Sequence, residues 1–143
     1  MQTVEDLQPL ILKWATDKDL IKPENSSKQS LKLLEEVGET AKAILKNDTP
    51  EIIDGIGDIF VVLIILAAQE DEEYNFDLND DYLMYKSEEC LNSVIYYDYV
   101  LGHNFLNVLC SRLNLDLFEC CLSAWNEIKD RKGKTVDGTF IKN

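Results

Sequence analysis

Six acidic residues flank a short break between two predicted helices, and acids of this kind bind divalent cations. Three lie in EEVGE at residues 35–39 and three in EIIDGIGD at residues 51–58, just before the apolar run 59–68. Burying a carboxylate costs several kcal/mol unless it is paired, hydrogen-bonded or bound to a metal. A solvated acidic face would not explain acids on so apolar a helix. The pattern therefore favours a divalent cation. The six residues are Glu35, Glu36, Glu39, Glu51, Asp54 and Asp58.

The other potential ligands narrow the choice of metal. The chain has one histidine, His103, which we expect in a loop or a cap without a catalytic role, and four cysteines without CxxC spacing. This argues against zinc and fits reduced, buried thiols. Oxygen ligands suit hard cations, so the sequence predicts Mg²⁺, with Mn²⁺ as the other option.

Composition limits the classes of partner. The 143 residues carry a net charge of -13, with a pI near 4.4, whereas nucleic-acid polymers and anionic membranes attract basic surfaces. The apolar run is about half of the roughly 20 residues that cross a bilayer, and no signal segment is evident. We expect a cytoplasmic protein with a single domain over residues 1–132 and a polar, basic tail over 133–143.

Two helices must position the acids. The first is predicted from Ser26 or Ser27 to about Lys46, and the second, with Thr49 as N-cap, continues to about Gln69. So short a connection makes an antiparallel hairpin that brings the two acidic clusters together. The expected apolar stripe of the first helix is Leu34, Val37, Ala41, Ile44 and Leu45.

The remaining pattern predicts an all-α bundle. Helices are expected from Thr3 or Asp6 to about Asp17, and over residues 82–101, 105–113 and 116–132. Pro9 favours the later start of the first of these, whereas Gly102 and Gly133 should end the second and the last. No strand pattern is evident.

Two further features concern packing. Gly38, Gly55 and Gly57 weaken helix propensity, so we expect close backbone approaches at these positions. The helix over 49–69 is apolar nearly all round after Ile59, as in a helix enclosed on every side. We expect five modest helices to be too few for that, which predicts a homodimer or homotetramer built on the hairpin.

The motifs together resemble the MazG-like family of all-α nucleoside triphosphate pyrophosphohydrolases. The resemblance rests on EEVGE, on the acids that begin the next helix, and on NEIKDRKGK at residues 126–134. It implies Mg²⁺-dependent cleavage of (d)NTP to (d)NMP and pyrophosphate, for cleaning or control of the nucleotide pool. The alternative is a non-enzymatic acidic helical module that regulates a basic partner.

The resemblance also implies ligands. Glu36, Glu39 and Asp58 are the leading metal ligands, with Asp54 as the fourth, and Glu35 would hold a second ion or activate water beside Glu36. The family's usual ExxD places Gly55 where its glutamate should be. We favour Asp54 with Asp58, and Glu51 with Asp54 is the other option.

The substrate contacts follow from the same resemblance. Lys129 and Arg131 would contact phosphates, although basic residues also complement the dipole at a helix C-terminus. Asn126 would bind ribose or phosphate. Trp14 would stack on the base or belong to the core, because it continues the apolar face of its helix. The basic end of the chain could complete its own site or a neighbour's.

Overall fold

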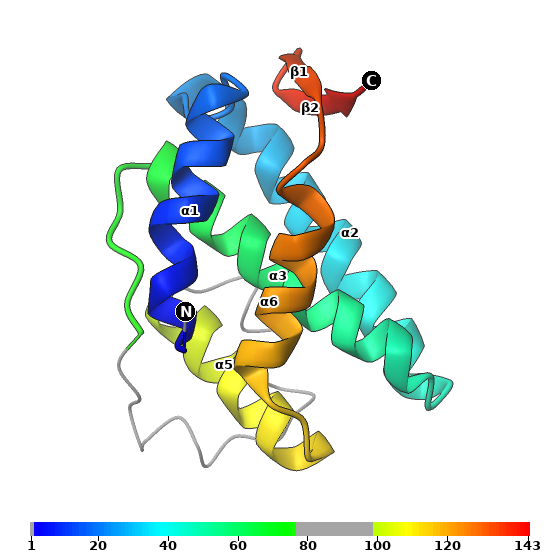
Figure 1. Ribbon diagram of the computed structural model, residues 1–143. Helices are drawn as coiled ribbons and strands as arrows, with labels where there is room; N and C mark the ends of the chain where they lie inside the picture. The colour runs from blue at the N-terminus through cyan, green and yellow to red at the C-terminus, as the bar shows by residue number, and fades with distance from the viewer. Residues whose placement is uncertain (1, 77–98) are drawn as a thin grey trace.

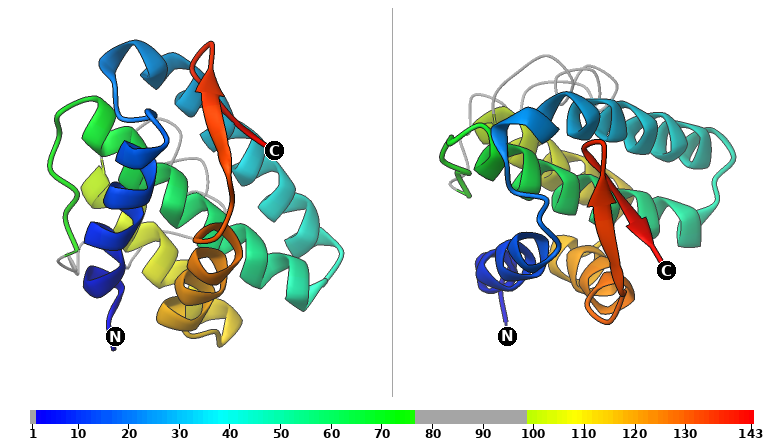
Figure 2. Two further views of the ribbon diagram at one scale, coloured as in Figure 1. Left: turned by 45° about the horizontal axis from the view of Figure 1, so that its top comes forward. Right: turned by 90° about the horizontal axis from the view of Figure 1, so that it is seen from above.

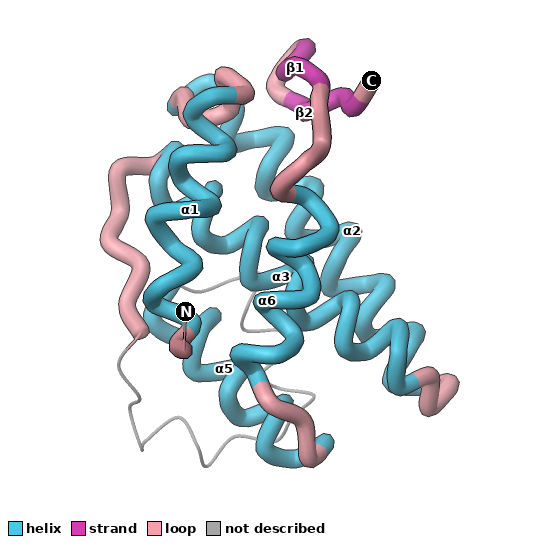
Figure 3. Tube along the Cα trace, in the orientation of Figure 1, coloured by secondary structure: helices cyan, strands magenta, loops and turns pink. Residues whose placement is uncertain are grey.

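The chain folds as an α-helical bundle with a small C-terminal β-hairpin (Figures 1 and 3). The computed structural model describes residues 2–76 and 99–143. The all-α class is confirmed, except that the hairpin was not expected. The elements are α1 (Val4–Asp17), a 3-10 turn (Pro23–Asn25), α2 (Ser26–Leu45), α3 (Thr49–Gln69), α5 (Tyr99–Leu113), α6 (Leu117–Ile128), β1 (Gly133–Val136) and β2 (Thr139–Lys142).

Helix α3 is the centre of the bundle. It packs against α1, α2, α5 and α6, and the view from above places α2 on one side of it and α1 with α6 on the other (Figure 2). Every side chain from Ile59 to Ala67 is at most 8% exposed. The sequence argument that one subunit could not enclose this helix is therefore wrong. Its conclusion, a homo-oligomer, stays a prediction.

The α2–α3 hairpin has the predicted connection. Asn47 adopts a positive φ of 54° between the two helices, a conformation that asparagine tolerates better than most residues. The N-cap of α3 is Asp48 rather than Thr49, because the Asp48 carboxylate accepts a hydrogen bond from the Glu51 N–H. Such a cap satisfies one of the N–H groups that a helix start leaves without a partner.

The face that α2 turns toward α3 differs from the predicted stripe. Leu34 and Leu45 are 51% and 84% exposed, so their assignment to the core was wrong. The inner face carries polar groups instead, because Thr40 lies against Gly55 of α3 and donates a hydrogen bond to the Glu36 carbonyl. The buried residues of α2 are Gln29, Leu33, Glu36, Val37, Thr40 and Ala43.

Two of the three glycines allow the close approaches that were predicted. A Cβ at Gly55 would overlap the Thr40 side chain, and one at Gly57 would overlap the Cys120 carbonyl oxygen of α6. These glycines bring α2 and α6 against the start of α3. Gly38 is exposed, and no atom lies within 4 Å of the Cβ it lacks, so the prediction for Gly38 was wrong.

The observed ends of α1 and α5 differ from the predicted ones. Helix α1 starts at Val4, where Thr3 and Asp6 form the capping box, so Pro9 lies past the first turn. The carbonyl that loses its partner to Pro9 belongs to exposed Glu5, where water can hydrate it. Helix α5 continues through Gly102. The helix expected over 82–101 lies largely outside the described residues.

The C-terminal end of the chain is a β-hairpin. Helix α6 ends at Ile128, earlier than predicted, and β1 pairs antiparallel with β2. The two turn residues, Asp137 and Gly138, both have positive φ, which matches the twist of a two-residue hairpin loop. In the described part of the chain, no helix is both long and apolar enough to cross a membrane.

Candidate functional site

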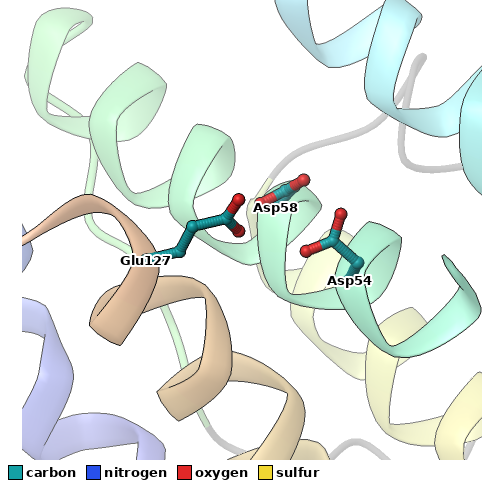
Figure 4. A group of neighbouring side chains, drawn as sticks. All are labelled: Asp54, Asp58 and Glu127. Atoms are coloured by element: carbon teal, nitrogen blue, oxygen red, sulfur yellow. The ribbon is translucent and has the colours of Figure 1, made fainter. Parts of the chain in front are cut away.

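Three carboxylates meet between α3 and α6. Asp54 and Asp58 lie one turn apart on α3, and Glu127 extends toward them from α6 (Figure 4). One oxygen from each lies within 4.8 Å of the others. Gly57 lets α6 approach α3 closely enough for this meeting.

A cavity of about 420 Å³ opens beside these acids. Its walls come from α1, α2, α3, α6 and the hairpin, so its chemistry depends on the whole fold rather than on α2 and α3 alone. Acids, cations and aromatic rings all take part in the lining. The acids are Glu36, Asp58 and Glu127, the cations are Lys28, Lys32, Arg131 and Lys142, and the aromatic residues are Trp14 and Phe140.

Glu36 is the buried acid of α2. Its Oε1 lies 3.3 Å from Lys32 Nζ, which also lies 2.6 Å from Glu35 Oε1. Its Oε2 is buried and finds no hydrogen-bond partner within the described ranges. Burial raises the pKa of Glu36 despite the Lys32 ammonium. A buried carboxylate oxygen without a partner is costly in a finished core but suits a cation site.

Asp58 has the most perturbed carboxyl of the cavity. Burial raises its pKa to about 8, and the charges of Glu36, Asp54 and Glu127 act in the same direction. Arg131 opposes them. At Asp58 itself, three neighbouring carboxylates thus outweigh the one cation that acts on its pKa. The site's donor set of carboxylate oxygens fits a hard divalent cation.

One end of the cavity wall, between α1 and the hairpin, is aromatic. The rings of Trp14 and Phe140 meet edge to face, with centroids 5.0 Å apart. The hairpin is tied to the end of α1, because the Thr135 hydroxyl donates a 2.7 Å hydrogen bond to the Lys18 carbonyl. Trp14 Nε1 is buried and, within the described residues, has no acceptor. This end offers a planar ligand both an apolar surface and one N–H donor.

The predicted site residues divide into two groups. Glu36, Asp54, Asp58, Arg131 and Trp14 come together at the cavity or its acidic cluster. The others are exposed and outside both. They are Glu35 and Glu39 on α2, Glu51 on α3, Asn126 on α6, and Lys129 just after α6.

His103 differs from its expected place. It is a buried residue of α5 rather than a loop or capping residue, and its Nδ1 is hydrogen-bonded to the Tyr74 hydroxyl at 2.7 Å. Burial lowers its pKa to about 4. Its distance from the acidic cavity, whose lining does not include it, agrees with a structural role.

Several cavity residues were missed by the sequence argument. Lys28 and Lys32 had a usable signal, because residues 28, 32 and 36 are four apart and share one side of a helix. No sequence signal indicated Glu127 or Lys142. Only the packing of α6 and the pairing of the hairpin strands bring these two side chains to the cavity. Phe140 could have been suspected only from the Asp137-Gly138 turn signal.

Comparison with known proteins supports the resemblance. Residues 25–89 match the family model of the MazG nucleotide pyrophosphohydrolase domain. The chain is also 46% identical over 67 residues to an uncharacterized 18.2 kDa protein from the rep-hol intergenic region of Haemophilus phage HP1. That alignment covers 45% of this chain and 41% of the phage protein. No solved structure matches significantly. The resemblance to the MazG family is therefore confirmed for residues 25–89, the segment that carries α2, α3 and the acids Glu36, Asp54 and Asp58.

Proposed function

We propose that the protein is a Mg²⁺-dependent pyrophosphohydrolase that cleaves a nucleoside triphosphate between its α- and β-phosphates. The observation that carries the proposal is the content of one cavity, where acids from three helices lie beside four cations and an aromatic pair. A nucleoside triphosphate has a matching set of needs: cations for its phosphates and a flat apolar surface for its base. The MazG match points to the same class of reaction.

The acids would hold the metal. Asp54, Asp58 and Glu127 are already within 4.8 Å of one another, and the unpartnered Oε2 of Glu36 belongs to the same cavity. When bound, a divalent ion supplies positive charge to the phosphates and makes water more acidic. Glu36, whose pKa is raised by burial, is suited to accept the proton of the attacking water.

The two exposed acids of EEVGE have supporting places. Glu39 lies one turn beyond Glu36, close enough for its charge to raise the Glu36 pKa, and we keep it as a further metal ligand. Glu35 holds the Lys32 ammonium at 2.6 Å and would thereby position that cation at the cavity wall.

The cations would bind the phosphates and stabilise the leaving pyrophosphate. Lys28, Lys32 and Lys142 line the cavity, and Arg131 Nη2 lies 3.5 Å from Glu127 Oε1. Fixed cations of this kind stabilise charge that develops in phosphoryl transfer. Lys129 and Asn126 lie outside the lining, so the proposal relies on Arg131.

The base would contact Trp14 and Phe140. Both rings line the cavity, and aromatic rings stack on bases of any sequence. The buried N–H of Trp14, which lacks an acceptor among the described residues, would donate a hydrogen bond to the base or the sugar.

The test is a panel of NTPs and dNTPs with and without Mg²⁺, read as monophosphate and pyrophosphate. We expect Mg²⁺-dependent release, lost by about a hundredfold or more in Asp58→Asn and Glu127→Gln. Glu39→Gln should lose less. Glu51→Gln is the matched control, because Glu51 is an exposed acid of the same helix, and it should stay near wild type.

Two outcomes would contradict parts of the proposal. Loss of activity in Glu51→Gln with none in Asp58→Asn would move the metal site one turn along α3. No release with any nucleotide would favour the acidic interaction module.

A further inference from the structure

Gln29 is a buried polar residue of α2 that the protein does not use internally. It is 7% exposed and lines the cavity. Within the described residues, its side-chain amide has no hydrogen-bond partner. Buried amides in folded proteins are almost always hydrogen-bonded, to protein or to water. The Gln29 amide can therefore find its partners only in the cavity, either in solvent or in a ligand.

Two other buried amides nearby do have internal partners. Asn25, one turn earlier on the chain, donates a hydrogen bond to the Leu20 carbonyl at 3.0 Å. Gln69 of α3 donates another to the same carbonyl at 2.9 Å. These two side chains hold the segment between α1 and α2 in place. No such structural task accounts for an amide, rather than an apolar side chain, at Gln29.

Gln29 lies toward the aromatic end of the cavity. The hairpin turn packs against its neighbour Lys28, because a Cβ at Gly138 would overlap the Lys28 side chain. Phe140 of the same hairpin lines the cavity with Gln29. Glu36 is about two turns further along α2, or about 10 Å at the usual rise per residue. A nucleotide separates its base from its phosphates in a similar way, so Gln29 is placed for the base.

We propose that the Gln29 side-chain amide recognises the polar edge of the base and so selects which nucleoside triphosphate the cavity accepts. Because a nucleotide must occupy the cavity, this recognition rests on the proposed function. A glutamine amide offers an acceptor and a donor side by side, and can form two hydrogen bonds with one base edge. Stacking on Trp14 and Phe140 tolerates any base, whereas a buried amide discriminates against a base that leaves it unpaired.

The first test compares the natural nucleotide that the protein prefers with an analogue whose base lacks the donor–acceptor pair. Purine riboside triphosphate serves for a purine, and the difluorotoluene deoxynucleoside triphosphate for a pyrimidine. We expect the wild-type kcat/KM to favour the natural nucleotide by about a hundredfold or more. Gln29→Met keeps the length of the side chain but removes the amide, and should reduce this preference by about tenfold or more. An unchanged preference in Gln29→Met would overturn the proposal.

Melting temperatures separate recognition from a structural role. Gln29→Met should melt at the wild-type temperature or above it, because no internal hydrogen bond is lost. Asn25→Leu is the matched control, since it removes a buried amide that is bonded within the protein. It should lower the melting temperature and leave the preference between the two nucleotides unchanged. A Gln29→Met protein that melts lower and loses activity on both nucleotides equally would show that Gln29 is structural.

A binding measurement distinguishes this recognition from the proposed reaction. The α,β-methylene forms of the same two triphosphates cannot be cleaved between these phosphates, and their affinities should show the same preference and its loss in Gln29→Met. If they do while no natural nucleotide is hydrolysed, the reaction is wrong and the recognition stands. If hydrolysis proceeds and neither measurement depends on Gln29, the recognition is wrong and the reaction stands. Neither binding nor hydrolysis would overturn both.

Discussion

The two halves of α3 differ in both burial and charge, because the first is only partly buried whereas the second is enclosed. Residues 49–58 contain two glycines and the acids Asp54 and Asp58, whereas residues 59–68 are apolar throughout. In the first half, like charges meet within 4.8 Å. In the second, Phe60 packs against the aromatic residues that follow α3, and Leu63 lies beside Gly102 of α5. The comparison teaches that the apolar half stabilises a helix whose other half carries closely spaced acids.

The largest expected loss of stability follows a substitution in the apolar half of α3. Phe60 is fully buried and packs against Tyr74, so Phe60→Ala should lower the free energy of unfolding by about 3–5 kcal/mol. Chemical denaturation measures this loss. The rise in melting temperature on adding Mg²⁺ should persist, and its disappearance would show that the two halves are not separable.

Acid should destabilise the apolar region through His103. Its pKa is about 4 when folded and about 6.5 when unfolded, so the unfolded chain binds the extra proton between these values. Stability is therefore full above pH 6.5 and falls by roughly 3 kcal/mol as the pH drops toward 4. The measurement is the free energy of unfolding across this range, as the difference between wild type and His103→Gln. If the free energy of unfolding changes with pH in parallel for the two proteins, His103 is not the cause of the loss of stability in acid.

Substitutions at two glycines allow a comparison of the two halves. Gly57 lies in the first half of α3, and Gly102 of α5 lies beside Leu63 in the second half. Gly57→Ala places a Cβ against the Cys120 backbone, which cannot yield without moving α6. It should cost about 1–3 kcal/mol and reduce activity by displacing Glu127. Gly102→Ala meets only the end of the flexible Leu63 side chain, at 3.2 Å, and should cost less. Thermal melts and turnover of both variants check the order.

The smallest expected change in the free energy of unfolding is an increase rather than a loss. Because the pKa of Asp58 is raised to about 8, the metal-free folded protein must either protonate this carboxyl or hold a disfavoured charge, whereas asparagine needs neither. Asp58→Asn should therefore raise the free energy of unfolding of the metal-free protein by about 0.5–2 kcal/mol while losing activity. Melting temperatures without metal, with EDTA present, measure the gain. Glu51→Gln should not change the melting temperature, since Glu51 is exposed. An Asp58→Asn protein that is less stable than the wild type would contradict the proposal that Asp58 lowers stability in exchange for activity.

Helix ends and connections that depend on neighbouring residues could be predicted from the sequence. The Asn47-Asp48 connection, the Thr3–Asp6 capping box and the Asp116 cap all lie where their residue types favour them. It failed where the choice depended on tertiary contacts. On α2, leucines and acids alternate around the helix, and only the fit of Thr40 against Gly55 decides that Glu36 turns inward and Leu34 outward.

The candidate site was predictable to a similar degree. Asp54, Asp58 and Glu36 share a hairpin whose short connection fixes their meeting, so their proximity followed from the chain itself. Glu127 of α6 follows Asp58 by about seventy residues in the sequence, and no periodicity in the sequence indicates that contact. Lys142 depends on a hairpin whose Asp137-Gly138 turn signal was present but outweighed by the helical pattern elsewhere.

The contact between Trp14 and Phe140 gives the molecule an optical reporter. The chain has two tryptophans, and Trp125→Phe would leave Trp14 as the single indole fluorophore. Its emission would respond to any ligand that enters between the hairpin and α1, because its ring lines that end of the cavity. Nucleotide affinity and the rate of entry can thus be followed by fluorescence without a label.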